Sequence, residues 1–355
     1  MNREKVIVAM SGGVDSSLAA ALLLEQGYDV TGVFLCLGTA GDREADARGC
    51  CSPQDAADAR RVADRLGIPL FVLNLQDEFQ SIIDYFVGEY AHGRTPNPCV
   101  YCNSRIKFGY LLRQADQLGA RFIATGHYAR LADIEGRRAI MRAAAIEKDQ
   151  SYALFAVGRS CLDRMLLPIG DLQDKARVRD MARSLGLVVH DKPDSQEICF
   201  VANDDYVSLL RSRAPAAMKP GSFVDSTGKV LGRHDGYGQF TIGQRKGMKV
   251  AMGVPYYVTK IDPASGDVTI GPRQQTLGRR LRACGTNWHC DIQVGSQWPA
   301  TVQIRYNHRG AAGIVKIISD NEFEVEFADD VAAITPGQAA VVHRDDRLLG
   351  GGWIE

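Results

Sequence analysis

The sequence predicts an α/β protein with a doubly wound parallel sheet, followed by a small β-rich central domain and a C-terminal β-barrel. Up to about residue 200, apolar runs rich in β-branched residues alternate with helical patterns, which is typical of a parallel sheet covered on both faces. After residue 206, short strand–turn–strand patterns replace the helical ones. A chain of 355 residues is also too long for one ordinary domain. We therefore expect domains at residues 1–206, 207–275 and 276–355.

The first domain is expected to alternate strands with helices in the order that a parallel sheet requires. Strands are predicted at 6–10, 30–35, 70–74 and 122–126, and helices at 18–25, 54–66, 79–90, 105–118 and 174–185. Most of these helices are closely followed by glycine, as is common where a helix ends. Because such sheets bind ligands at the carboxyl ends of their strands, we expect a site there.

The rest of the chain is expected to consist of short strands with a local excess of positive charge. Glycine-containing hairpin patterns cover 223–231 and 256–270, and further strands are predicted at 298–306, 313–318 and 322–327. The formal net charge is zero, but between Thr241 and Lys316 there are eleven Lys and Arg residues and only three Asp residues. This excess favours a polyanion-binding module, and an ordinary solvated basic face is the alternative.

The cysteine content and the N-terminus indicate the cellular compartment. Nine cysteines, an odd number in a long chain, do not fit a secreted disulfide framework. No apolar run approaches the roughly 20 residues that span a bilayer. Met1 to Lys5 leads directly into a predicted strand, without the apolar region of a signal peptide. We expect a cytoplasmic protein with reduced or catalytic thiols and no membrane partner.

The segment Ser11-Gly-Gly-Val-Asp-Ser16 lies between a predicted strand and a predicted helix. Gly12 and Gly13 allow backbone angles and close approaches that a side chain would prevent. The N–H groups and the dipole at the start of a helix favour an anion, so a phosphate is the expected ligand. The segment lacks the Gly-Lys-Ser/Thr ending of a Walker A loop and the Rossmann glycine spacing. A tight turn without a ligand is the alternative.

Cys99-Val-Tyr-Cys102 is the second candidate site. Asn103 or Ser104 is expected to cap the following helix, which would place these thiols at a helix N-terminus, where the thiolate is stabilised. A zinc site would need two further ligands, and the adjacent Cys50 and Cys51 offer poor geometry for them. Cys199 stands nearly one hundred residues downstream. Considered alone, Cys199 is more typical of a buried core cysteine than of a catalytic one.

Five motifs in order resemble a known family. Ser11 to Ser16 is similar to the pyrophosphate loop of the ATP pyrophosphatases, whose fold is of the adenine nucleotide alpha hydrolase type. Together with 95–103, 125–129, 148–152 and 194–200, it resembles the bacterial tRNA-specific 2-thiouridylases over essentially the whole chain. The resemblance implies ATP-dependent 2-thiolation of the wobble uridine of tRNA. In that reaction the C2 oxygen is adenylated, sulfur comes from a cysteine persulfide, and AMP and pyrophosphate are released.

The resemblance also implies roles for individual residues. Cys102 matches the nucleophile, and Cys199 matches the persulfide-bearing cysteine that forms a transient disulfide with Cys102. ATP, with Mg²⁺, would be bound by Ala9, Met10, Ser11, Gly12, Gly13, Val14, Asp15, Ser16, Leu35 and Gly126. The tRNA would be contacted by Asn97, Pro98, Cys99, His127, Lys148, Asp149, Gln150, Arg305, Tyr306 and Gln338. A cysteine desulfurase or a sulfur-relay protein would be the sulfur donor.

Several points stay open in the sequence. Many relatives have Asp where Cys99 stands, so Cys99 is not assigned as the nucleophile, and 49–53 receives no role. His127 could serve only local structure, and 148–150 could be a plain polar turn. Rival interpretations are another adenylating ligase and a non-catalytic RNA-binding or sulfur-carrier protein. A further rival is an iron–sulfur cluster held by Cys99, Cys102 and Cys199.

Overall fold

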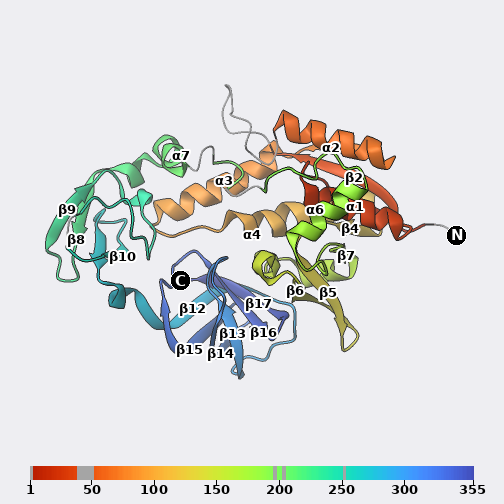
Figure 1. Ribbon diagram of the computed structural model, residues 1–355. Coiled ribbons are helices and arrows are strands. Elements are labelled where there is room, and N and C mark those ends of the chain that lie inside the picture. Colours follow the sequence, from red (N-terminus) through yellow and green to blue (C-terminus); the bar gives the residue numbers. More distant parts are fainter. Residues whose placement is uncertain (1–2, 38–51, 195–197, 202–204, 251–252) are drawn as a thin grey trace. The chain divides into compact units, whose positions relative to one another are not determined.

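The computed structural model describes residues 3–37, 52–194, 198–201, 205–250 and 253–355, and Cys50 and Cys51 lie outside these ranges (Figure 1). The chain divides into two compact units. The first unit contains Met1–Ile82, Cys99–Asp204 and Asp346–Leu348. The second unit contains Ile83–Pro98, Asp205–Asp345 and Leu349–Glu355.

The first unit is built on the predicted parallel sheet. Its five strands lie in the order β3-β2-β1-β4-β7, and every neighbouring pair is parallel. The strands are β1 (Lys5–Ala9), β2 (Asp29–Cys36), β3 (Leu70–Asn74), β4 (Phe122–Ala124) and β7 (Met165–Leu166). The strands β1, β2 and β4 are mostly buried, as strands covered on both faces should be. The doubly wound parallel sheet is therefore confirmed.

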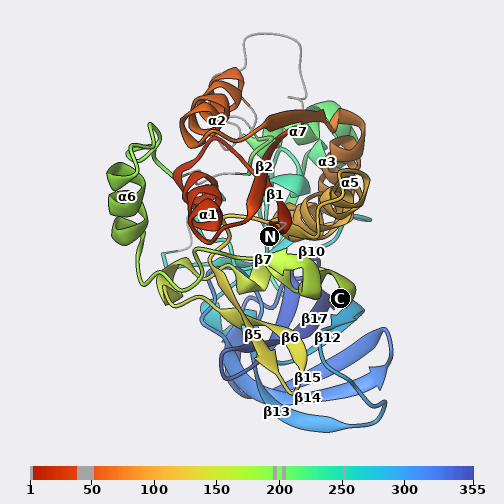
Figure 2. The ribbon, with the colours of Figure 1, turned by 90° about the vertical axis from the view of Figure 1, so that its right-hand side faces the viewer.

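Helices cover this sheet, with α1 and α2 on one side of β1 and β2 and α5 on the other (Figure 2). The helices of the unit are α1 (Val14–Glu25), α2 (Pro53–Leu66), α3 (Gln76–Ala91, which continues into the second unit), α5 (Leu111–Gln117) and α6 (Lys175–Ser184). Short 3₁₀ turns lie at Ile146–Lys148, Ser151–Leu154 and Arg159–Arg164. Apolar residues of α1, α2 and α6 share one buried core with β1, β2 and β4. This core fixes the start of α1 at the carboxyl end of β1.

An antiparallel hairpin interrupts the α/β pattern after β4. It consists of β5 (Ala129–Ile134) and β6 (Arg137–Arg142), joined by Glu135 and Gly136. Both turn residues have positive φ, 53° and 74°, as a two-residue type I′ hairpin turn requires. Glutamate is an unusual residue for that conformation, so the turn carries no clear sequence signal. The hairpin was not predicted for this reason.

The second unit contains two β structures, and the first is a four-stranded sheet in the order β10-β11-β8-β9. Its strands are β8 (Gly221–Val224), β9 (Val230–His234), β10 (Tyr257–Ile261) and β11 (Val268–Gly271). Both expected hairpins, β8–β9 and β10–β11, are antiparallel, and β8 pairs with β11 in parallel. The connecting helices are α7 (Tyr206–Arg213) and the 3₁₀ turns at Pro215–Met218, Tyr237–Gln239 and Arg273–Thr276.

The second β structure is a closed six-stranded antiparallel barrel (Figure 2). Its order is β12-β15-β14-β13-β16-β17, and β12 pairs with β17 to close it. The strands are β12 (Leu277–Trp288), β13 (Gln297–Gln303), β14 (Ala311–Ser319), β15 (Glu322–Ala332), β16 (Ala339–Arg344) and β17 (Arg347–Ile354). Alternating side chains fill its interior, so the predicted C-terminal barrel is confirmed. Among the helices that the structure describes, none is long and apolar enough to cross a membrane.

Candidate active site

The glycine loop joins β1 to α1 and is shaped to receive an anion. Gly12 has φ +72°, and a Cβ atom there would lie 2.2 Å from the carbonyl oxygen of Asp55, so only glycine fits. Gly13 is the N-cap of α1 and provides no side-chain cap. The first N–H groups of a helix have no acceptor within the helix, so those of α1 are directed toward the loop. This arrangement has the geometry of the phosphate cradle that the sequence predicts, and phosphate binding itself stays a prediction.

Hydroxyl groups hold the loop against the first turn of α1. The backbone N–H of Ser11 donates to Ser16 Oγ at 3.1 Å. The Oγ atoms of Ser16 and Ser17 both donate to the carbonyl oxygen of Gly13, at 3.2 and 2.8 Å. Ser16 and Ser17 are buried, so these bonds are protected from water. The loop is therefore held in its conformation by its own serines.

The other two segments predicted to bind ATP end at the same sheet edge. Gly126 follows β4, and a Cβ atom there would lie 2.6 Å from the backbone nitrogen of Ser16 and from the backbone carbon of Asp15. Leu35 is buried near the end of β2. Met10, directly after β1, donates its N–H to Val33 of β2 at 2.8 Å. The structure thus places Gly126 directly against the start of α1, and the ATP contacts themselves stay a prediction.

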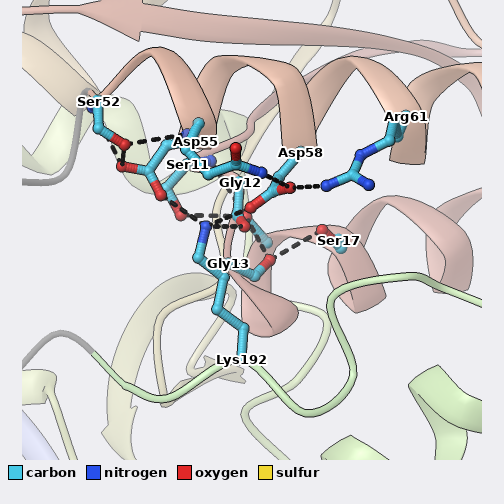
Figure 3. Close-up of polar contacts among 11 residues, drawn as sticks. Ser11, Gly12, Gly13, Ser17, Ser52, Asp55, Asp58, Arg61 and Lys192 are labelled. Carbon is cyan, nitrogen blue, oxygen red and sulfur yellow. Dashed lines mark hydrogen bonds and ion pairs between the residues drawn. The ribbon is translucent and has the colours of Figure 1, made fainter. Parts of the chain in front are cut away.

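Lys192 contacts this loop, a feature that the sequence analysis missed (Figure 3). Its Nζ donates to the carbonyl oxygen of Gly12 at 3.0 Å, and to the carboxylates of Asp55 and Asp58 at 2.6 Å each. Asp58 also pairs with Arg61. Burial alone would raise the pKa of Asp58, but the bonds from Lys192 and Arg61 hold that pKa below its usual value. The segment around Lys192 is thereby attached to α2 and to the loop.

A second group of charges lies at the start of α1. Lys175 Nζ lies 2.7 Å from an oxygen of Asp15 and 2.7 Å from an oxygen of Asp194. Asp194 also pairs with Lys148 at 2.9 Å. The phenol of Tyr128 donates to Asp15 at 2.7 Å. Burial would raise the pKa of Asp194, but Lys175 and Lys148 hold that pKa below its usual value, so the carboxylate is ionised at neutral pH.

Cys99 and Cys102 lie in the first turns of a helix that begins earlier than predicted. α4 (Pro98–Cys102) runs directly into a π-helix at Asn103–Tyr110 and then into α5. Asn103 and Ser104 therefore lie inside the helix, and the predicted cap at these residues is wrong. Proline suits the first turn of a helix because its missing N–H is not needed there. π-helical segments are rare in proteins, but those that occur often lie at functional sites.

The candidate sulfur-transfer residues are thiols in the described part of the chain. Cys99 is exposed, whereas Cys102 and Cys199 are half-buried. Asn103, next to Cys102, is buried, and its amide donates to the carbonyl oxygen of Ala153 at 3.0 Å. Phe200, next to Cys199, packs edge-on against Phe79 at 5.6 Å between ring centres. Both candidate cysteines thus belong to the first unit, which also holds the glycine loop.

Several residues predicted to contact tRNA in the first unit are engaged internally. His127 is buried, its Nδ1 lies 2.7 Å from Thr125 Oγ1, and burial together with Lys107 lowers the pKa of its imidazole well below the usual value. Asp149 accepts bonds from the backbone of Ala143 and Ser151 and pairs with Arg142. These contacts show that both side chains support local structure, which the sequence left as an alternative.

Gln150 and Lys148 are engaged in the same way. Gln150 exchanges two hydrogen bonds with the backbone of Tyr128, at 2.8 and 3.0 Å. Lys148 keeps a side chain that is 40% exposed while it pairs with Asp194. Lys148 is therefore more open to a ligand than Asp149 and His127, whose exposed fractions are 6% and 8%. Direct tRNA contact by any of them stays a prediction.

In the second unit, Gln338 supports the residues that precede Cys99. Its Nε2 donates to the carbonyl oxygens of Thr95 and Pro96, at 3.1 and 3.0 Å. The backbone N–H of Asn97 donates to the Tyr85 hydroxyl at 3.4 Å. The barrel loop that contains Gln338 thus holds the approach to Asn97 and Pro98, a role that the sequence analysis did not identify.

Arg305 and Tyr306 lie after strand β13. The guanidinium of Arg305 donates to the carbonyl oxygen of Ala332 at 3.0 Å, whereas the Tyr306 side chain is exposed. Part of the excess of positive charge between residues 241 and 316 is neutralised within the barrel. Arginines of β12 pair with acidic residues of β15, as Arg279–Asp330, Arg280–Glu326 and Arg282–Glu322. The exposed Tyr306 ring is therefore a better candidate for a nucleic-acid contact than the arginines of β12.

No group of three His, Cys, Asp or Glu side chains in the described ranges is arranged to hold a metal ion. Cys99, Cys102 and Cys199 are all within these ranges. The donor set for the three-thiolate cluster considered above is therefore not gathered in this structure.

Comparison with known proteins covers nearly the whole chain. Family models match residues 4–203 (tRNA methyl transferase HUP domain), 210–272 (tRNA methyl transferase PRC-barrel domain) and 278–354 (aminomethyltransferase beta-barrel domain). The tRNA-specific 2-thiouridylase MnmA of Carboxydothermus hydrogenoformans is 47% identical over 100% of this chain and 98% of its own length. The MnmA of Rhodopirellula baltica is 45% identical over 99% of this chain and 96% of its own length.

A third relative, the MnmA of Clostridium perfringens, is 43% identical over 100% of this chain and 99% of its own length. Identity at this level over full length requires the same fold and the same order of motifs. The comparisons therefore do not support the alternative of another adenylating ligase. The chain belongs to the family of tRNA-specific 2-thiouridylases, PP-loop enzymes that use ATP to thiolate tRNA.

Proposed function

We propose that this protein thiolates C2 of the wobble uridine of tRNA by adenylating the C2 oxygen and transferring sulfur from a persulfide on Cys199. One observation carries the proposal. The first unit holds the glycine loop at the start of α1, and a hydrogen bond from Lys192 to Gly12 and the ion pairs of Lys175 with Asp15 and Asp194 join this region to the chain just before Cys199. Activation by ATP and sulfur transfer by a cysteine can therefore occur in the same unit.

The activation step follows from leaving-group chemistry. A carbonyl oxygen is a poor leaving group. When the C2 oxygen of the uridine attacks the α phosphate of ATP, this oxygen becomes part of an adenylate and can then leave readily as AMP. The bond between the α and β phosphates breaks, and pyrophosphate remains in the glycine loop. The N–H groups at the start of α1 stabilise the charge of the pyrophosphate, and Mg²⁺ bound to the phosphates would neutralise more of it.

Sulfur then replaces the adenylated oxygen by one of two routes. In the first, the terminal sulfur of the Cys199 persulfide attacks C2 and AMP departs. The Cys102 thiolate next attacks the inner sulfur of the persulfide. The bond between the two persulfide sulfurs breaks, and the outer sulfur remains on the uridine. In the second, Cys102 attacks that inner sulfur first and releases hydrosulfide, which attacks C2 and displaces AMP. Both routes end with a Cys102–Cys199 disulfide, which a thiol reductant must reopen.

The partners follow from the same scheme. The tRNA would be contacted by Asn97, Pro98, Cys99, His127, Lys148, Asp149, Gln150, Arg305, Tyr306 and Gln338. A cysteine desulfurase or a sulfur-relay protein would load the persulfide. We assign catalysis to residues 1–206 and support of the tRNA to 207–275 and 276–355. Reduced thiols and this substrate favour a cytoplasmic location.

The test is a thiolation assay on single-cysteine variants. Cys102→Ser and Cys199→Ser are each expected to abolish 2-thiouridine formation from ATP, cysteine, a cysteine desulfurase and unmodified tRNA, while ATP binding persists. Cys284→Ser is the matched control, because Cys284 is a half-buried barrel thiol whose pKa is raised by burial and by Glu355. Full activity in either of the first two variants would refute the two-cysteine scheme. A brown, iron-containing protein after anaerobic purification would instead support a cluster.

A further inference from the structure

Two ion-pair clusters attach the chain that precedes Cys199 to the glycine loop. Lys192 donates to the carbonyl oxygen of Gly12 and to the carboxylates of Asp55 and Asp58. Asp194, two residues after Lys192, pairs with Lys175, and Lys175 also pairs with Asp15. Gly12 lies just before the N-cap of α1, and Asp15 lies in its first turn. The chain is thus held at two nearby points, one on each side of the cap.

Both lysines have used their hydrogen-bonding capacity. An ammonium group has three N–H donors. Those of Lys192 reach Gly12, Asp55 and Asp58 at 3.0, 2.6 and 2.6 Å. Lys175 reaches the two oxygens of Asp15 at 2.8 and 2.7 Å and Asp194 at 2.7 Å. A phosphate oxygen could bind either lysine only by displacing one of these partners, so the contacts favour attachment over direct phosphate binding.

These ion pairs are partly shielded from water. The side chains of Asp58, Asp55 and Lys175 are 7%, 13% and 13% exposed, and those of Asp194, Lys192 and Asp15 are 22%, 27% and 30% exposed. Removing one partner of a shielded ion pair destabilises the protein far more than removing one partner of a surface pair, because the remaining charge is left without compensation. The same segment also carries a surface pair, Arg183–Asp191 at 3.1 Å, whose side chains are 54% and 70% exposed. The surface pair serves as an internal comparison.

The attachment limits where Cys199 can go. Cys199 follows Asp194 by five residues and Lys192 by seven. Five fully extended residues span at most about 18 Å, so the thiol stays within that reach of the ion pairs. If the chain before Cys199 is released from these ion pairs, the sulfur of Cys199 can sample a much larger volume. Sulfur transfer then slows, because the reaction depends on the orientation of this sulfur.

We propose that Lys192 and Asp194 are positioning residues that hold the Cys199 segment at the ATP loop, so that persulfide sulfur meets the uridine that ATP has activated. The inference rests on the proposed function, because it takes Cys199 as the sulfur carrier. It assigns the two residues no contact with substrate. It also predicts that their loss harms sulfur delivery more than it harms activation.

The experiment compares two sulfur supplies with full-length enzyme, ATP and unmodified tRNA. In one reaction, a cysteine desulfurase and cysteine load the persulfide on Cys199. In the other, added hydrosulfide attacks the adenylated C2 directly and displaces AMP, so no sulfur needs to pass through Cys199. The measured quantity is the ratio of the persulfide-driven rate to the hydrosulfide-driven rate of 2-thiouridine formation.

Lys192→Met is expected to lower this ratio by about tenfold or more, Asp194→Asn to lower it in the same direction, and Lys192→Arg to restore most of it. Arg183→Met removes only surface pairs, those of Arg183 with Asp191 and with Asp180, and should leave the ratio unchanged. The hydrosulfide-driven rate also shows that each variant is folded.

An unchanged ratio in Lys192→Met, whether both rates fall together or neither falls, would overturn the inference. Cys199→Ser separates this failure from failure of the proposed function. Persulfide-driven activity that survives in Cys199→Ser would overturn the proposed function itself. Loss of that activity, with an unchanged ratio in Lys192→Met, would overturn only the positioning role.

Discussion

Replacing Gly126 with alanine tests whether the start of α1 forms the ATP site. The new Cβ would lie 2.6 Å from Ser16 N and from the backbone carbon of Asp15, about 0.8 Å short of the 3.4 Å at which ordinary contact begins. Both atoms are backbone, so no flexible side chain can move aside. The first turn of α1 must therefore shift by several tenths of an ångström away from β4.

A shift of this size is expected to lower the rate of ATP-dependent thiolation by about 100-fold, or about 2.7 kcal/mol, because small displacements of a phosphate cradle carry large penalties. The assay combines the affinity for ATP, from calorimetry, with tRNA-dependent AMP release. Gly158→Ala is the matched control, since Gly158 is exposed and an added Cβ there would meet only Ser160 Oγ, at 4.0 Å. Wild-type ATP affinity and rate in Gly126→Ala would refute the assignment of this helix terminus to the phosphates.

Four further predictions concern tRNA binding and stability. Tyr306→Ala is expected to weaken tRNA binding by about 1–3 kcal/mol through lost base stacking, and Arg305→Ala to reduce the salt dependence of that binding, both measured by titration at several salt concentrations. An unchanged tRNA affinity would remove either assignment. The pKa of His127 is lowered well below 6.5 in the fold, so the unfolded chain binds the extra proton. The free energy of unfolding should therefore fall by up to about 1.4 kcal/mol per pH unit as the pH drops below 6.5, and His127→Gln should flatten this slope in denaturant titrations. Asp149→Ala strips the partner from Arg142, whose side chain is 13% exposed, and is expected to cost about 3–5 kcal/mol in urea unfolding. A loss below 1 kcal/mol would show that Asp149 is not the structural anchor of its turn.

Local sequence patterns predicted the sheet and the loop because the physics there is local. A buried β-branched run, two glycines and a helix start occur in sequence at 6–17, and each needs only its neighbours to be interpreted. The same holds for α2, where Ser52 and Asp55 form a capping box. The helix boundary after Cys102 was wrong, because Asn103 has cap-forming chemistry but lies inside a helix that begins at Pro98.

Long-range pairing could not be read from the sequence. Lys192 and Gly12 are 180 residues apart, and no spacing rule connects a lysine in a loop to a carbonyl group in another loop. The pairs of Asp194 with Lys148 and Lys175 have the same character. Motif resemblance indicated that 148–150 matters, but only the folded chain shows that Asp149 and Gln150 support the backbone around Tyr128 and Ala143.

The central claim, that two cysteines deliver sulfur to an adenylated uridine, is tested most directly by a single turnover without reductant. Enzyme carrying a persulfide on Cys199 is mixed with ATP and unmodified tRNA, and nucleosides, nucleotides and non-reduced peptides are then quantified by mass spectrometry. The account predicts one AMP and one Cys102–Cys199 disulfide for each 2-thiouridine formed. Formation of 2-thiouridine while both cysteines remain thiols would contradict it.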